Sequence, residues 1–280
     1  MDLLHMVTKA VLLLFVVSSM LAMGLSLTVS QVVASLRNGR LVLLTLLANF
    51  VLLPLAALAL ARLLQLEPPH AIGLLLLGMA AGAPFLPKLT EIAKGNMAFA
   101  VGMMVLLMVV TVGYLPFVLP FFLEGVSVDP AKIVRSLILI MLLPLAAGLF
   151  FKARLERIAA RVQPLFNRIS TVSFALLAVL LLVANIGNVL EVFGTGGILA
   201  GALLIVAGFG IGWLFGGRSN DTRRVMALGT AQRNVSAAIL VSNQNFDDPK
   251  VIVMVIVTAM IGLIMLIPIS RALARSRPRG

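Results

Sequence analysis

Two positively charged side chains lie inside long apolar segments of this chain, where a charge needs a partner. Lys88 follows Gly-Ala-Pro-Phe-Leu-Pro in the apolar segment 69–95, and Arg233 follows Gly-Thr-Ala-Gln in the segment 222–245. An arginine near the centre of a bilayer costs roughly 2.5 to 3.5 kcal/mol on insertion scales, so it normally pairs with an anion or a carbonyl. Fixed positive charge at this depth could hold the anionic group of a solute.

Both segments also contain residues that interrupt a helix. Freed backbone groups at membrane depth must be buried in protein or line a cavity, because lipid cannot hydrogen-bond to them. Paired interruptions are typical of secondary transporters, which bind solutes and ions near the middle of the bilayer. We therefore expect substrate or ion binding around the two interruptions, by Pro84, Pro87, Lys88, Thr90, Thr230, Gln232, Arg233, Asn234 and Ser236.

The composition places these segments in a membrane. The chain is 61% hydrophobic and 11% charged, with a mean hydropathy of +1.14, whereas soluble domains have about 25% charged residues. A helix needs about 20 apolar residues to cross the hydrocarbon. The sequence predicts an all-α polytopic membrane protein with nine transmembrane helices, near residues 6–28, 41–63, 70–94, 97–123, 133–151, 170–190, 194–216, 223–245 and 250–270.

The net charge of +12 follows the loops between these spans. Cations gather in every second loop, which is how the positive-inside rule marks the cytoplasmic side, so we expect no nucleic-acid partner. The N-terminus should lie outside and the C-terminus in the cytoplasm, in a plasma membrane or bacterial inner membrane. The basic loops and tail contain Arg37, Arg40, Lys94, Lys152, Arg154, Arg157, Arg161, Arg168, Arg218, Arg223, Arg224, Arg271, Arg275, Arg277 and Arg279, whereas the others contain Glu67, Glu124, Asp129, Glu191, Asp247 and Asp248.

The order of the spans predicts two halves of opposite orientation. The interrupted segments are the third and eighth spans, so they cross the bilayer in opposite senses. An inverted-topology repeat has this arrangement. We expect one membrane domain over 1–280, with a first half at 1–123 that lacks its first helix and a complete second half at 133–271.

Four stretches carry a family resemblance. Met23-Gly24-Leu25-Ser26-Leu27, Ala48-Asn49-Phe50 with Pro54, the stretch 93–98, and Gly229 to Ser236 resemble the bile acid:sodium symporter family in order and spacing. The resemblance implies nine or ten helices in two inverted repeats, a panel domain and a core domain, and two discontinuous helices that cross near the midplane. It implies organic anions as substrates, such as bile acids and smaller carboxylates.

The sodium ligands that the resemblance implies are altered in this chain. The Ser-Asn pair of the family falls on Leu86 and Pro87, and its two hydroxyl ligands fall on Ala100 and Met104. Its shared acidic residue falls on Gly229 when Asn234 is aligned without a gap. None of these side chains is an ordinary sodium ligand. The resemblance therefore implies that the first sodium site of the family is dismantled here.

The second sodium site keeps amide side chains. One glutamine of the family falls on Asn49, and the other falls on Arg233, or on Gln232 if one residue is inserted. Sodium is thus possible near Asn49 and Gln232, and we expect no other cofactor. We hypothesise that Lys88 and Arg233 replace the two sodium ions. Transport is proton-coupled if Lys88 becomes charged as the anion binds, and it is a uniport otherwise.

Simpler roles remain open for the same residues. Lys88 could be the interfacial end of the third span, with its ammonium group snorkelling to water. Arg233 could pair only with helix carbonyls or with Asn49, and Asn49 could form an ordinary bond between helices. Thr230 and Ser236 could bond to carbonyls of their own helix.

Three classes of function were compared. A secondary active transporter of an organic anion, working by alternating access, accounts for both buried interruptions. A membrane receptor or scaffold does not require cations inside them. An intramembrane enzyme needs an acid pair, a zinc motif or a nucleophile with its base at membrane depth, and the only histidines, His5 and His70, lie near span ends. We therefore expect a transporter and not an enzyme.

Overall fold

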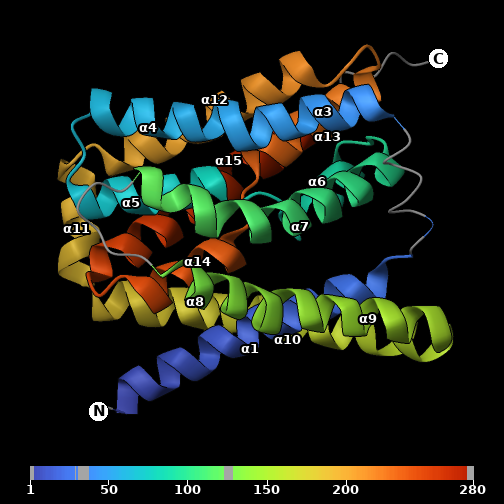
Figure 1. Ribbon diagram of the computed structural model, residues 1–280, viewed down its shortest axis with the longest axis horizontal. Helices are drawn as coiled ribbons and strands as arrows, with labels where there is room; N and C mark the ends of the chain where they lie inside the picture. The colour runs from blue at the N-terminus through green and yellow to red at the C-terminus, as the bar shows by residue number, and fades with distance from the viewer. Residues whose placement is uncertain (1–2, 29, 31–37, 123–128, 276–280) are drawn as a thin grey trace.

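The chain folds into a bundle of helices that run mostly along one direction (Figure 1). The computed structural model describes residues 3–28, 30, 38–122 and 129–275, and these residues contain helices and no strand. Large apolar side chains such as Phe121, Leu214 and Ile264 point outward. An apolar exterior of this kind suits lipid, so the protein is an integral, multi-pass membrane protein.

Seven helical segments of the described residues are long and apolar enough to cross a membrane. Two of them contain an internal π-helical turn and are labelled in three parts. The seven are α1 (Leu3–Ser26), α3–η1–α4 (Gly39–Leu47, Ala48–Leu52, Leu53–Leu63), α7 (Met97–Phe122), α8–η2–α9 (Pro130–Ser136, Leu137–Leu142, Leu143–Arg154), α10 (Glu156–Ala184), α12 (Gly197–Phe215) and α15 (Pro249–Arg275).

Two further apolar segments are each split into a pair of shorter helices, as the sequence predicted. The first pair is α5 (Pro68–Met79) and α6 (Leu86–Ile92), and the second is α13 (Asn220–Ala231) and α14 (Val235–Asn245). The first interruption starts earlier than predicted, at Ala80. It ends before Pro87 and Lys88, which already belong to α6, because proline fits the first turn of a helix.

One predicted span has different limits in the structure. The span expected at 170–190 is the end of α10, which starts at Glu156. The cations of residues 156–168 predict a loop, but charge does not stop a helix that lies beyond the bilayer. A short helix, α11 (Ile186–Gly194), then connects α10 to α12.

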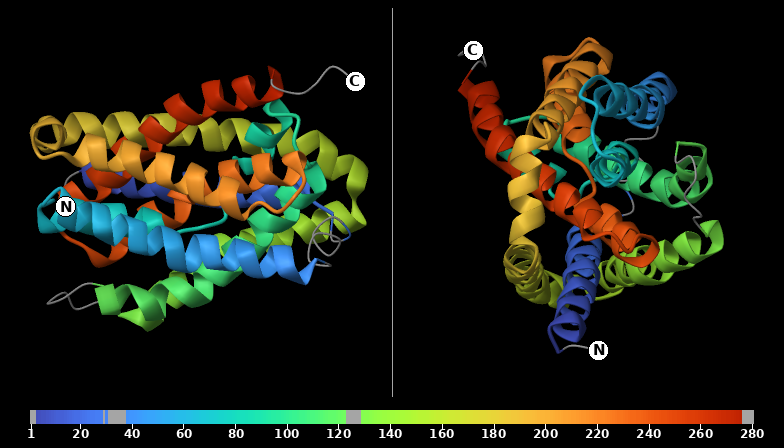
Figure 2. Two further views of the ribbon diagram at one scale, coloured as in Figure 1. Left: turned by 90° about the horizontal axis from the view of Figure 1, so that it is seen from above. Right: turned by 90° about the vertical axis from the view of Figure 1, so that its left-hand side faces the viewer.

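The helices form two groups (Figures 1 and 2). The small group contains α1, α8–η2–α9 and α10, and the large group contains α3–η1–α4, α5, α6, α7, α12, α13, α14 and α15. Within the small group α1 crosses α9 closely at Gly24 and Gly148, where a Cβ on Gly24 would lie 2.3 Å from the Leu145 carbonyl oxygen. The groups meet where α14 lies against α1 and α8, and where α7 lies against α8.

Charge separates the two ends of the bundle. The starts of α3, α10 and α13 lie at the same end as the C-terminus, and we call this the cationic end (Figure 1). The N-terminus and the acidic loops lie at the other end (Figure 2). This separation agrees with the predicted alternation of loops, although Arg37, Glu124, Arg277 and Arg279 lie outside the described residues.

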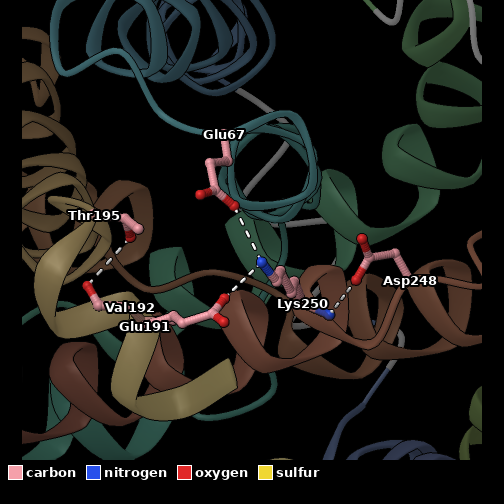
Figure 3. Close-up of polar contacts among 6 residues, drawn as sticks. All are labelled: Glu67, Glu191, Val192, Thr195, Asp248 and Lys250. Atoms are coloured by element: carbon pink, nitrogen blue, oxygen red, sulfur yellow. Dashed lines mark hydrogen bonds and ion pairs between the residues drawn. The ribbon is translucent and has the colours of Figure 1, made fainter. Parts of the chain in front are cut away.

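An ion-pair cluster joins three elements at the end opposite the cationic end (Figure 3). The Lys250 ammonium group, in the first turn of α15, lies 3.2 Å from Glu67 Oε2 and 2.5 Å from Glu191 Oε2. Glu67 precedes α5 and Glu191 belongs to α11. The cluster therefore holds α11, which connects the small group to the large group, against the starts of α5 and α15.

Candidate functional site

The two interruptions meet inside the large group. The backbone N–H of Asn234 donates to the carbonyl of Ala80 over 2.9 Å, which joins the second interruption directly to the first. Thr111 on α7 supports the first interruption, because its hydroxyl accepts from the Ala81 N–H at 3.0 Å and donates to the Ala81 carbonyl at 3.1 Å. Backbone groups that left the helices are thus paired within the protein.

Arg233 donates to carbonyl groups at the C-terminal end of α5. Its side chain is buried, with 3% of its surface exposed. Nε donates to the Leu77 carbonyl and Nη2 to the Gly78 carbonyl, each over 2.8 Å. Nη1 donates to Asn49 Oδ1 at 2.8 Å and to the Thr230 carbonyl at 3.2 Å. A helix ends in unpaired carbonyls with partial negative charge, so a guanidinium group there satisfies both the hydrogen bonds and the dipole.

Asn49 is oriented by a π-helical turn. Pro54 has no N–H and cannot bond to the carbonyl four residues before it, and the N–H of Leu53 donates instead to the Ala48 carbonyl, five residues back. The freed Phe50 carbonyl accepts from the Tyr114 hydroxyl at 2.7 Å. The turn carries Asn49 toward α13, where its Nδ2 donates to Thr230 Oγ1 at 3.1 Å.

These contacts bear on the sodium site expected near Asn49 and Gln232. The Asn49 oxygen already accepts from a permanent cation, and the end of α5 is bound by the same cation. Gln232 is buried and lines a cavity of about 10 Å³ together with Arg233 and Thr258. The guanidinium group therefore uses the Asn49 oxygen and the carbonyl oxygens at the end of α5, and carbonyl oxygens of broken helices are the kind of ligand that holds sodium in transporters.

Lys88 lies outside the contacts that Arg233 makes. Its ammonium group lies 2.7 Å from Glu91 Oε2 on the same helix, and its side chain is 58% exposed. The ammonium group is thus exposed and paired with a carboxylate, and it does not face the buried contacts between the two interruptions. Four of the five N–H groups of the Arg233 guanidinium donate to protein oxygens.

The remaining predicted site residues divide between the two interruptions. Asn234 caps α14, since its Oδ1 accepts from the Ala237 N–H at 3.1 Å, and Ser236 is buried in the first turn of that helix. Thr90 is buried in α6, and its hydroxyl has no hydrogen-bond partner among the described residues. Pro84 and Pro87 are partly exposed at the start of α6.

Two residues of the site were missed from the sequence. Thr111 and Tyr114 are the only side chains of α7 with a hydroxyl group, and they lie three residues apart on one face of an otherwise apolar helix. Polar groups in such a helix normally have a partner inside the protein. That signal could have placed both residues at the interruptions.

Comparisons with known proteins agree with this architecture. Residues 11–192 match the profile of the Sodium Bile acid symporter family. The chain is 31% identical over 246 residues to the probable sodium/metabolite cotransporter BASS2, chloroplastic, of Oryza sativa subsp. japonica. The aligned region covers 84% of this chain and 57% of that protein. It is 27% identical over 235 residues to the probable sodium/metabolite cotransporter BASS1, chloroplastic, of Arabidopsis thaliana. Here the aligned region covers 82% of this chain and 58% of that protein.

A third relative comes from an animal. The chain is 24% identical over 252 residues to the hepatic sodium/bile acid cotransporter of Rattus norvegicus, with 86% of this chain and 69% of that protein covered. The chain thus spans a little under three fifths of the two plant relatives. Since the family profile covers well over half of the sequence, the chain belongs to the sodium bile acid symporter family.

Proposed function

We propose that this protein is a secondary active transporter of an organic anion that works by alternating access. The observation that carries the proposal is the meeting of two interrupted helices, with the Arg233 guanidinium group bound to the end of α5. Binding sites of transporters lie at such meetings. The names of the relatives, which refer to metabolites and bile acid, support an organic solute and argue against an enzyme.

The proposed architecture counts each interrupted pair as one crossing. Together with the seven long helices this gives nine transmembrane segments in two inverted halves, 1–123 and 133–271. The small group then corresponds to the panel domain and the large group to the core domain. By the positive-inside rule, the cationic end faces the cytoplasm and the N-terminus lies outside.

The substrate is proposed to bind at the start of α14. This helix begins at Val235, and its first N–H groups and dipole favour an anion. Asn234 and Ser236 are the nearest side chains from the predicted site. Because α14 lies against α1 and α8, a solute bound here would sit at the boundary of the two groups. Movement of one group past the other would then expose it to either side.

Arg233 is proposed to make this transporter independent of sodium. Sodium at the end of a half-helix neutralises carbonyl oxygens, and Arg233 does so with a charge that cannot leave. Uptake of a radiolabelled small keto acid and of a radiolabelled bile acid into proteoliposomes tests the proposal. We expect saturable uptake of one of them that persists when sodium is replaced by choline. A strict sodium requirement would overturn the role of Arg233, and no uptake of any organic anion would overturn the transporter.

The substitution Arg233→Gln should restore an effect of sodium. Glutamine removes the fixed charge and leaves the oxygens of Leu77, Gly78 and Asn49 to a free cation. We expect sodium to raise the melting temperature of the variant but not that of the wild-type protein, as measured by scanning fluorimetry in detergent. Arg62→Gln, an exposed position on α4, is the matched control. Equal responses to sodium in all three proteins would contradict the replacement.

A further inference from the structure

A second polar cavity lies at the cationic end, away from the interruptions. Its volume is about 610 Å³, and it opens between α3, the end of α12 and the start of α13. Arg40, Arg218 and Arg223 line it, and no carboxylate does. Three arginines around one cavity make a strongly positive site for an anion.

None of the ion pairs found among the described residues includes one of these three arginines. Arg223 is held in place by its Nε, which donates to the Gly217 carbonyl at 2.8 Å, so its outer nitrogens are left for a ligand. Asp221 is the nearest acidic residue in the sequence, but it does not line the cavity.

Two helix N-termini add to the positive potential. Asn38 caps α3 and Ser219 caps α13, and both capping residues line the cavity. The positive ends of two helix dipoles therefore lie beside the three arginines. The Thr222 hydroxyl donates to the Gly216 carbonyl at 2.7 Å, which fixes the turn that carries Arg218. The arginine-bearing turn is thus ordered by its own hydrogen bonds.

The rest of the cavity wall is apolar and belongs to the lipid-facing surface. Leu44, Leu214 and Phe215 line it, and Leu214 is 77% exposed. A small inorganic anion would use the arginines and leave this wall uncovered. A phospholipid would use both parts, with its phosphate group against the arginines and its acyl chains along α3 and α12. Basic pockets between membrane helices bind anionic headgroups in this way.

We propose that this cavity binds the headgroup of an anionic phospholipid from the surrounding leaflet. The inference rests on the cavity alone and is independent of the transport activity. The lipid would join α3, α12 and α13 at one membrane surface. Because α13 leads directly into the second interruption, the lipid would fix the position of one half of the interrupted pair relative to the bilayer.

Native mass spectrometry and scanning fluorimetry of the purified full chain test the proposal, with phosphatidylglycerol as the probe. We expect the wild-type protein to retain phosphatidylglycerol and gain thermal stability, whereas phosphatidylcholine has no such effect. Each cation near an anionic lipid contributes a factor of about five to affinity. The double variant Arg40→Gln/Arg218→Gln should therefore bind phosphatidylglycerol about 25-fold more weakly.

The matched control is Arg271→Gln/Arg275→Gln, which removes two exposed cations from the same end but outside the cavity. It should bind phosphatidylglycerol as the wild-type protein does. The proposal is overturned if both double variants lose the lipid equally, or if phosphatidylcholine binds as well as phosphatidylglycerol. It is also overturned if inorganic phosphate alone reproduces the stabilisation, since the ligand would then be a free anion.

Discussion

Arg233 and Asn49 depend on each other inside the large group. The guanidinium group has oxygen partners on three elements, and Asn49 supplies the only side-chain oxygen among those described. Burial makes each bond costly to lose, because no water can replace the missing partner. The pair therefore fixes the distance between η1 and the two interruptions.

A double-mutant cycle measures this dependence. Asn49→Leu should destabilise the protein by about 1.5 to 3 kcal/mol, the range for a hydrogen bond to a charged group. Once Arg233→Met is also present, the added effect of Asn49→Leu should shrink, with a coupling energy of about 1 to 3 kcal/mol. Unfolding in mixed micelles gives both values. Additive effects would show that the two side chains act separately.

The sequence predicted the setting of Arg233 better than that of Lys88. Arg233 lies about ten residues from either end of its span, so burial and a carbonyl partner followed from depth alone. Lys88 follows two prolines in a segment whose interruption could end before or after it. One residue of difference along a helix turns a side chain by about 100 degrees. The sequence could not decide whether Lys88 faced the interior, and the structure places it beside Glu91 on the exposed side.

Gly82 allows the first interruption to pass α7. Its φ of +83° lies in the left-handed region, and a Cβ there would lie 2.4 Å from the Met108 backbone nitrogen. Thr111 is on the same helix and holds the neighbouring Ala81. The close contact with α7 therefore requires glycine at this position for two independent reasons.

In Gly82→Ala, the added Cβ should clash with the backbone of α7 and prevent the first interruption from packing against that helix. The backbone of α7 cannot move away cheaply, so we expect a loss of thermal stability and of transport. Gly113→Ala is the matched control, because this glycine also lies at α7 but a Cβ there meets nothing within 4 Å. The control should be neutral or more stable by about 0.5 to 1 kcal/mol. Measured melting temperatures that fall equally in both variants would contradict the steric argument.

The two groups of helices are connected through α11, and Lys250 holds that connection (Figure 3). Its two carboxylate partners come from the segment before α5 and from α11. Both carboxylates are about half exposed, so the attraction is screened by salt. The cluster can restrain the groups without locking them.

Lys250→Met should lower the melting temperature at low ionic strength, because Glu67 and Glu191 would then repel each other without a cation between them. The difference from wild type should shrink as the ionic strength is raised with choline chloride.

Lys88→Met, which removes an exposed pair within one helix, should change neither stability nor transport. Loss of proton-driven uptake in Lys88→Met would instead support the hypothesis that Lys88 takes part in coupling.

The sequence predicted the all-helical membrane class and both interrupted segments, since these follow from hydropathy, glycine and proline. The two inverted halves remain a prediction. The division into two packed groups could not be read from these patterns, because helices such as α1 and α9 recognise each other through close contacts of small residues like Gly24 and Gly148. Such contacts join positions more than a hundred residues apart.

The Tyr114 hydroxyl, which donates to the Phe50 carbonyl, offers a way to observe the π-helical turn without any label. The chain has one tyrosine, Tyr114, and one tryptophan. The vibrational spectrum of a single phenol, free of overlap from other tyrosines, therefore reports one hydrogen bond at one turn. A change in that spectrum on addition of a solute would show that the polypeptide beside Asn49 has rearranged.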